Sequence, residues 1–238
     1  MTEGIERAMT AGREVQGVLR VGFFRAAAGR FVLAVAENFQ RRYPTCEVQI
    51  RENQLSDGLR LLREDEIDLL LLMLPMQEPD LSAGPVLIRE PRVLAVGVGH
   101  PLAGRPSVSM DDLGRHSVLV APGGLPDYLR ESVVPERTPG GRTIRRGPSF
   151  ATIQEMLSLV GAGRGVYPVP AHTSRYYARP DVTYLTIVDA PDLEWAFTWR
   201  RAAETGRIRA FNACAVEIVE AAKSDKNSDN WFAVSAER

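Results

Sequence analysis

Apolar and polar positions change their spacing twice between Val18 and Pro44, which divides this stretch into three parts. The residues from Val18 to Phe24 alternate as in a β-strand, and the small residues Ala26–Gly29 follow as a tight turn. Apolar residues then recur at spacings of three and four, on one face of a helix: Val32, Val35 or Ala36, Phe39 and Tyr43. Pro44 ends the helix, because the residue before a proline is pushed out of helical geometry. Strand, turn and helix in this order predict the start of an open α/β sheet.

The same alternation of strand and helix continues to residue 74. Cys46–Arg51 alternates as a strand with one more polar face, and Ser56 or Asp57 is expected to cap a helix. The inward face of that helix carries Leu59, Leu61 and Leu62. Ile67–Leu74 is almost continuously apolar, which is typical of a parallel strand covered on both faces by helices.

A stretch rich in proline, glycine and acidic residues, Pro75–Pro85, separates this half from a second one. The turn His100–Gly104 follows the first long strand of that half. The chain is expected to cross into a second lobe near residues 90–98 and to cross again near 193–198. Helices are expected after Pro126, from Thr152 to Gly163 and over Arg207–Ala222; Thr152 and Glu155 form a capping-box pattern. Further strands are expected over Val86–Ile88, Arg92–Val98, Ser117–Ala121, Thr143–Arg146, Val166–Val169, Val182–Val188 and Glu194–Arg200.

Ligands of an open parallel sheet bind where the carboxyl ends of strands meet the amino ends of helices, and the exposed N–H groups there favour anions. The turn Phe24–Gly29 is therefore the first candidate wall of a pocket. A strand and helix with no ligand at their turn is the alternative for this stretch taken alone.

Composition and charge narrow the classes of function. The 238 residues are 45% hydrophobic and 25% charged, and the formal net charge of −1 offers no broad basic surface for nucleic acid. Cys46 and Cys214 lack the spacing of a zinc site or a redox pair, which fits a reducing cytoplasm. The first residues lack the apolar core of a secretory signal, and the run Leu69–Pro75 is too short to span a bilayer. A cytoplasmic protein without membrane segments is expected.

Candidate chemistry is sparse. The glycines of Gly161–Gly165 follow a helix and enter a strand, the reverse of a dinucleotide fingerprint. Glu64, Asp65, Glu66 and Asp68 favour a solvated turn over a pair of catalytic carboxylates or a cation site. Three histidines, His100, His116 and His172, have no metal-ligand spacing, and no serine lies in a G-x-S-x-G turn. The sequence predicts no enzyme activity, no metal and no cofactor.

Seven short motifs, in this order over residues 17–222, carry a resemblance to a known family: Leu19–Gly22, Phe39–Pro44, Glu66–Leu69, His100–Ala103, Asp112-Leu113, Val160–Gly165 and Trp199-Arg200. The chain resembles the effector-binding domain of LysR-type transcriptional regulators. The resemblance implies a type II periplasmic-binding-protein-like fold, with two α/β lobes joined by two crossings and a small molecule bound between them. Lobe one would comprise 17–90 and 196–222, lobe two 91–195, with 1–16 as a residual linker helix and 223–238 as a polar C-terminal tail.

The resemblance also implies a function and partners. The domain would sense a small-molecule effector, and DNA would be contacted only through the family's winged helix-turn-helix, which either was removed from this chain or is lacking in its gene. A homodimer is implied, with the helix near Phe31–Tyr43 beside the partner's helix near Thr152–Ala162. A stand-alone solute-binding protein and an enzyme on the same fold are the alternatives.

Family members commonly place hydroxyl side chains at three pocket positions, which correspond here to Ala26, Leu55 and the region Ser149–Thr152. Two of the three are apolar, which favours an effector with an apolar or aromatic body. Arg25 is a candidate carboxylate clamp, with a surface arginine as the equal alternative. The predicted effector is a small carboxylic acid with an apolar body. Its predicted ligand-binding residues are Phe24, Arg25, Ala26, Leu55, Pro122, Gly123, Ser149, Phe150, Thr152 and Tyr167.

Overall fold

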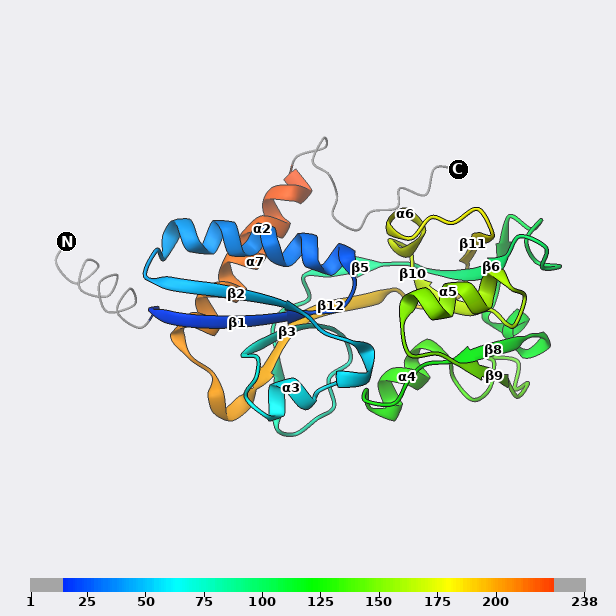
Figure 1. Cartoon of the computed structure of the whole chain (residues 1–238), viewed down its shortest axis with the longest axis horizontal. Coiled ribbons are helices and arrows are strands. Elements are labelled where there is room, and N and C mark those ends of the chain that lie inside the picture. The colour runs from blue at the N-terminus through cyan, green and yellow to red at the C-terminus, as the bar shows by residue number, and fades with distance from the viewer. Residues whose placement is uncertain (1–14, 225–238) are drawn as a thin grey trace. The chain divides into compact units, whose positions relative to one another are not determined.

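The computed structural model describes residues 15–224, which form two compact units of mixed α and β structure (Figure 1). Unit 1 contains the described residues up to Asn53, then Leu59–Ile88, then those from Glu194 onward. Unit 2 contains Gln54–Gly58 and Arg89–Leu193. The expected linker helix over 1–16 and the polar tail over 223–238 lie almost wholly outside the described residues. The predicted architecture of two α/β halves, each with its own mixed sheet, is confirmed.

Unit 1 is built on a six-stranded sheet with the order β2-β1-β3-β12-β4, in which β5 also pairs with β12. The strands are β1 (Gly17–Phe23), β2 (Cys46–Glu52), β3 (Leu69–Met73), β4 (Leu81–Ala83), β5 (Ile88–Glu90) and β12 (Leu193–Arg200). β1 runs parallel to both β2 and β3, whereas β12 runs antiparallel to β3 and β4. All five residues of β3 are buried, as its continuous apolar run predicts.

Two long helices, α2 (Ala26–Arg42) and α7 (Gly206–Ser224), lie on one face of this sheet in Figure 1. Their apolar faces meet through Phe39 and Phe211, whose ring centroids are 5.3 Å apart. Phe211 also packs edge-on against Phe197 of β12, again at 5.3 Å. Aromatic side chains from two helices and a strand therefore form the centre of this core.

Two expectations for unit 1 are wrong. Ala26–Gly29 is not a turn: α2 begins at Ala26, so the small residues form its first turn and Gly29 lies against the Phe23 ring. The helix expected from Ser56 or Asp57 is broken into a 3₁₀ turn η1 (Leu55–Asp57) and a short helix α3 (Arg60–Arg63). Neither Ser56 nor Asp57 caps α3, because Gly58 between the pieces has a φ of 53°. Asp57 instead accepts a hydrogen bond from the Gln54 N–H at 2.9 Å.

Unit 2 contains a four-stranded sheet with the order β10-β6-β11-β7 and a separate two-stranded sheet of β8 and β9. The strands are β6 (Arg92–Gly97), β7 (Ser107–Val108), β8 (Ser117–Val120), β9 (Arg145–Ser149), β10 (Tyr167–Pro170) and β11 (Val182–Ile187). The remaining elements are α4 (Asp127–Val133), α5 (Ile153–Gly161), α6 (Thr173–Tyr176) and the 3₁₀ turns η2 (Met110–Arg115) and, in unit 1, η3 (Arg201–Ala203). The strand expected over Thr143–Arg146 forms later, at Arg145–Ser149, because it follows pairing with β8 and not an apolar pattern of its own.

Helix α5 begins and ends as its sequence predicts. The Thr152 hydroxyl oxygen accepts a hydrogen bond from the Glu155 N–H at 3.2 Å. The Glu155 carboxylate accepts one from the Ala151 N–H at 2.7 Å, one residue before the usual capping-box partner. Gly163 has a φ of 68°, the left-handed conformation expected after a helix. Met156, Leu157 and Val160 are buried on the inner face of α5.

Residues 54–58 belong to unit 2, although the residues directly before and after them in the sequence belong to unit 1. A Cβ on Gly58 would lie 1.8 Å from the carbonyl oxygen of Gly124, so the two backbones meet directly. Leu55 packs against the hydrophobic core of unit 2. Two glycines therefore allow this short segment to join unit 2.

Candidate functional site

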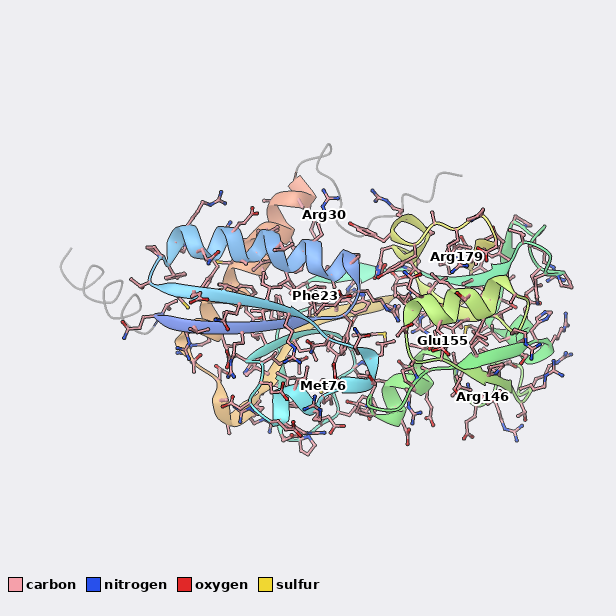
Figure 2. The ribbon with its side chains drawn as sticks, viewed as in Figure 1. Phe23, Arg30, Met76, Arg146, Glu155 and Arg179 are labelled. Carbon is pink, nitrogen blue, oxygen red and sulfur yellow. The ribbon has the colours of Figure 1, made fainter. Side chains whose placement is uncertain are left out.

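In unit 1, the predicted site residues Phe24, Arg25 and Ala26 lie together where β1 ends and α2 begins. Phe24 is buried at 3% exposure, Arg25 is half-buried and Ala26 is exposed. Phe23, labelled in Figure 2, is the last residue of β1. Its ring lies against Gly29 in the first turn of α2, where the absence of a side chain leaves room for it. A strand end joined directly to a helix start therefore lies at the position where the sequence predicts the first wall of a pocket.

Arg25 has an unusual backbone. It occupies the residue before the first turn of α2 with φ 72° and ψ 155°, and its side chain makes no capping hydrogen bond. Only glycine adopts this region without strain, and strained residues of this kind cluster at binding and catalytic sites. The 17-residue helix that follows has its positive dipole end at this point. A guanidinium and a helix start at one place favour an anionic group.

Asn53 is a candidate that the sequence analysis missed. It directly follows β2, and its N–H donates to the Phe23 carbonyl oxygen at 2.8 Å, so it lies at the same strand ends as Arg25. Its side chain is buried at 4% exposure. No periodic pattern singles out an asparagine after a strand. The only available signal was its position in the loop to which the family resemblance assigned Leu55.

In unit 2, Phe150 and Tyr167 are buried and pack edge-on with their ring centroids 5.0 Å apart. Both belong to the hydrophobic core of unit 2, and Leu55 packs against the same core. The structure thus brings together three of the predicted apolar site residues. Pro122 and Gly123 lie in the loop after β8, and a Cβ on Gly123 would meet nothing within 4 Å.

Ser149 and Thr152 are placed differently from each other. Ser149 is the exposed last residue of β9, paired with Val120 of β8. Thr152 is also exposed, and its hydroxyl accepts from the Glu155 N–H as the cap of α5, which begins at Ile153. Both hydroxyls therefore lie at the surface, and that of Thr152 already has one hydrogen bond.

A cavity of about 170 Å³ lies within unit 2 between β8 and α4. Its apolar floor includes Leu119, Val134 and the predicted site residue Tyr167, all buried. Its full lining is Leu119, Val120, Ala121, Asp127, Arg130, Glu131, Val134, Glu136, Arg146 and Tyr167. Arg146, labelled in Figure 2, donates to the carbonyl oxygens of Val134 and Pro135, each at 3.2 Å. An engineered cavity of about 150 Å³ in another protein holds benzene, so this one has room for a ring of that size.

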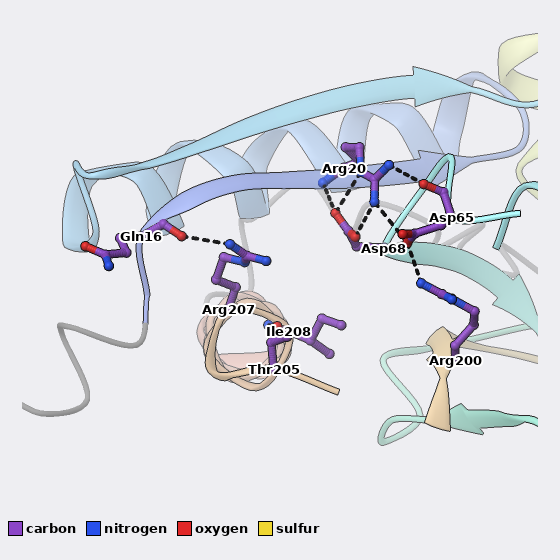
Figure 3. Close-up of polar contacts among 8 residues, drawn as sticks. All are labelled: Gln16, Arg20, Asp65, Asp68, Arg200, Thr205, Arg207 and Ile208. Carbon is purple, nitrogen blue, oxygen red and sulfur yellow. Dashed lines mark hydrogen bonds and ion pairs between the residues drawn. The ribbon is translucent and has the colours of Figure 1, made fainter. Parts of the chain in front are cut away.

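Acidic residues between α3 and β3 form ion pairs with arginines (Figure 3). Arg20 donates to both Asp68 carboxylate oxygens, at 3.2 and 2.8 Å, and also pairs with Asp65. Arg200 pairs with Asp65 as well. The hydrogen bonds that Arg20 donates to Asp68 raise the pKa of Arg20. These acids are thus engaged in ion pairs, and residues 15–224 contain no cluster of three or more acidic, histidine or cysteine side chains suited to a metal.

The three histidines all belong to unit 2. His100 and His116 pack edge-on at 4.7 Å, and burial lowers the pKa of both. His172 is buried, with its Nδ1 2.9 Å from the carboxylate of buried Glu90.

Comparison with known proteins decides the family. A family model described as the LysR substrate binding domain matches residues 12–219, most of the chain. The chain belongs to this family. A relative, the HTH-type transcriptional regulator BudR of Raoultella terrigena, is 26% identical over 211 residues, covering 88% of this chain and 71% of BudR. AlsR of Bacillus subtilis (strain 168) is 26% identical over 213 residues, covering 88% of this chain and 69% of AlsR.

Solved LysR structures share the fold. The effector-binding domain of QuiR in complex with shikimate has a TM-score of 0.70 at 18% identity, covering 87% of this chain and 98% of that one. HinK, a LysR family regulator from Pseudomonas aeruginosa, has a TM-score of 0.68 at 21% identity, covering 92% of this chain and 77% of HinK. The resemblance to LysR regulators and the type II periplasmic-binding-protein-like fold are therefore confirmed. This LysR domain is the effector-sensing part of a transcriptional regulator.

Proposed function

We propose that this domain senses a small carboxylic acid with an apolar body. The observation that carries the proposal is Arg25, a non-glycine residue held at φ 72° at the start of a 17-residue helix. Strain of this kind persists where the surrounding structure enforces it, which supports a binding role over that of an ordinary surface arginine. A guanidinium binds a carboxylate through two parallel hydrogen bonds, and the helix dipole adds to the attraction.

The apolar body of the effector follows from the side chains around these positions. Ala26 and Leu55 occupy positions where relatives of this family commonly carry hydroxyls, so each adds apolar surface. Phe24 in unit 1 and Phe150 and Tyr167 in unit 2 are buried aromatic residues, and we propose that they contact this body. We propose that Pro122, Gly123, Ser149 and Thr152 contribute the polar contacts of unit 2. The domain is proposed to act by binding alone, without catalysing a reaction.

A thermal-shift screen of the 238-residue protein tests this proposal. A ligand that binds only the folded state raises the melting temperature, by an amount set by its concentration relative to Kd. Aromatic and branched aliphatic acids are expected to raise it, and neutral sugars are expected to leave it unchanged. Arg25→Ala should weaken acid binding by about 1.5–3 kcal/mol, the range for a hydrogen bond to a charged group. Sugars that bind more tightly than every acid would contradict the proposed pocket.

The assembly is proposed to be a homodimer in the cytoplasm, with α2 of each protomer antiparallel to α5 of its partner. Leu33, on the outer side of α2, is 53% exposed and would be covered by such a contact. Two-fold dimers are the commonest oligomers of soluble proteins. Light scattering of wild type and Leu33→Glu tests the contact: a dimer converted to a monomer supports it, and a monomeric wild type refutes it. We propose that DNA is contacted only outside this 238-residue chain, because its net charge of −1 offers no broad basic surface.

The described helices contain none that is long and apolar enough to cross a membrane.

A further inference from the structure

Asn53 carries a buried amide that nothing in the described part of the chain satisfies. The residue is 4% exposed, and both its Nδ2 and its Oδ1 lack a hydrogen-bond partner among residues 15–224. About nine in ten buried polar groups in proteins are paired, so a side chain with neither polar atom paired is unusual. A small molecule with a matching donor and acceptor would relieve this cost.

The position of the amide is fixed by the backbone around it. A Cβ on Gly22 would lie 3.0 Å from Asn53 Nδ2 and 2.7 Å from Ile67 Cδ1. The absence of a side chain at Gly22 therefore makes the room that the amide occupies. The Asn53 N–H is held by the Phe23 carbonyl oxygen, so the residue cannot withdraw without breaking that bond.

Asn212 shows how the same side chain behaves in a purely structural setting. It is buried at 7% exposure on α7, and its Nδ2 donates to the Ile208 carbonyl oxygen at 3.0 Å. Its Nδ2 thus stabilises the preceding helical turn, whereas its Oδ1 lacks a partner among the described residues, so one of its two polar atoms is paired. Asn53 makes no such bond and instead lies at the carboxyl ends of β1 and β2, the edge of the sheet where ligands of this kind of fold bind.

We propose that Asn53 is a specificity-determining residue that binds a hydroxyl group of the effector. A hydroxyl group both donates and accepts hydrogen bonds. One hydroxyl can donate to Oδ1 and accept from Nδ2, or two neighbouring hydroxyls can each pair with one of these atoms. Arg25 lies two residues after Phe23, whose carbonyl oxygen accepts from the Asn53 N–H, so Arg25 and Asn53 belong to neighbouring backbone positions at the same strand ends. The proposal assigns a carboxylate at Arg25 and a hydroxyl at Asn53 to the same small molecule. The effector is then a hydroxylated carboxylic acid. This inference rests on the proposed function and narrows its substrate class.

Calorimetric titration of the 238-residue protein with benzoate and its three monohydroxy derivatives tests the assignment. Wild type should bind at least one hydroxybenzoate about tenfold or more tightly than benzoate. This gain in affinity is expected from a hydrogen bond to a buried group that otherwise has no partner. Asn53→Leu, which has nearly the same size and no polar atoms, should bind that derivative and benzoate equally. Asn53→Ala is titrated in parallel because it cannot overpack the site.

Thermal melts of the same variants separate a ligand-binding amide from a structural one. Asn53→Leu removes two unpaired buried groups, so its melting temperature should equal or exceed that of wild type. Asn212→Leu is the matched control and should melt lower, because it loses a hydrogen bond. A lower melting temperature for Asn53→Leu with an unchanged preference among the acids would overturn the inference and assign Asn53 to a buried water. Equal binding of all four acids by wild type would also overturn it while leaving the proposed function standing. Binding of none of them would overturn the inference, and the aliphatic acids of the thermal-shift screen would then decide the proposed function.

Discussion

Replacing Arg25 by alanine and by glycine isolates the strain in its backbone. Both variants lack the arginine side chain, so any contact that this side chain makes is lost equally in the two proteins. They differ only in the Cβ methyl group, which restricts the backbone of alanine and is missing in glycine. At φ 72° and ψ 155°, an alanine is strained and a glycine is not. The glycine variant should therefore be the more stable one, the reverse of the usual order.

The magnitude follows from two opposing effects. Relief of a strained backbone of this kind is worth about 1–3 kcal/mol. Glycine loses about 0.5–1 kcal/mol more conformational entropy on folding than alanine does. Arg25→Gly should thus be more stable than Arg25→Ala by about 0.5–2 kcal/mol.

Urea unfolding followed by circular dichroism measures this difference, with Ala34→Gly as the control. Ala34 lies inside α2, where glycine should lower the free energy of unfolding by about 0.5–1 kcal/mol. Opposite signs at positions 25 and 34 are the expected result. An Arg25→Gly variant that is equal to or less stable than Arg25→Ala would show that the backbone is relaxed there, and the main support for a binding role of Arg25 would be lost.

Three further changes test the packing and charge of the fold. Thr152→Ala removes the cap of α5 and should cost about 0.5–2 kcal/mol in urea unfolding. Phe211→Ala empties the aromatic centre of unit 1 and should cost about 3–5 kcal/mol by the same measurement. A hydrogen bond from the Ser109 N–H lowers the pKa of Asp112, so its stabilising effect is present above the pKa of the unfolded carboxyl and is lost as pH falls through the folded value. Asp112→Asn should therefore flatten the acid side of the stability curve, and an unchanged acid transition would contradict that role.

The elements with a strong apolar period were predictable, because burial of one face dictates the pattern. The inner face of α2, the buried strand β3 and the cap of α5 all appear where their residues indicate. Tertiary contacts decided the rest. The helix expected around Leu59 is interrupted because Gly58 meets the backbone of Gly124, a contact from a distant part of the chain.

The backbone around the candidate site was predictable only in part. A strand ending near Phe24 and a helix after it follow from local pattern, but α2 begins at Ala26 and not after the small residues Ala26–Gly29. The role of Arg25 remains a prediction. The strained φ of Arg25 could not be predicted, because a positive φ is expected at glycine and carries no signal at arginine. Asn53 was missed because burial of its amide depends on Gly22 and Ile67, which only the folded sheet brings beside it.

Calorimetric comparison of benzoate with benzyl alcohol tests the central claim most directly, because the two ligands share a ring and differ in charge. If the domain senses an anion with an apolar body, benzoate should bind more tightly by about 1.5–3 kcal/mol, and the difference should shrink in Arg25→Ala. Equal affinity for the acid and the alcohol, or tighter binding of the alcohol, would contradict the account.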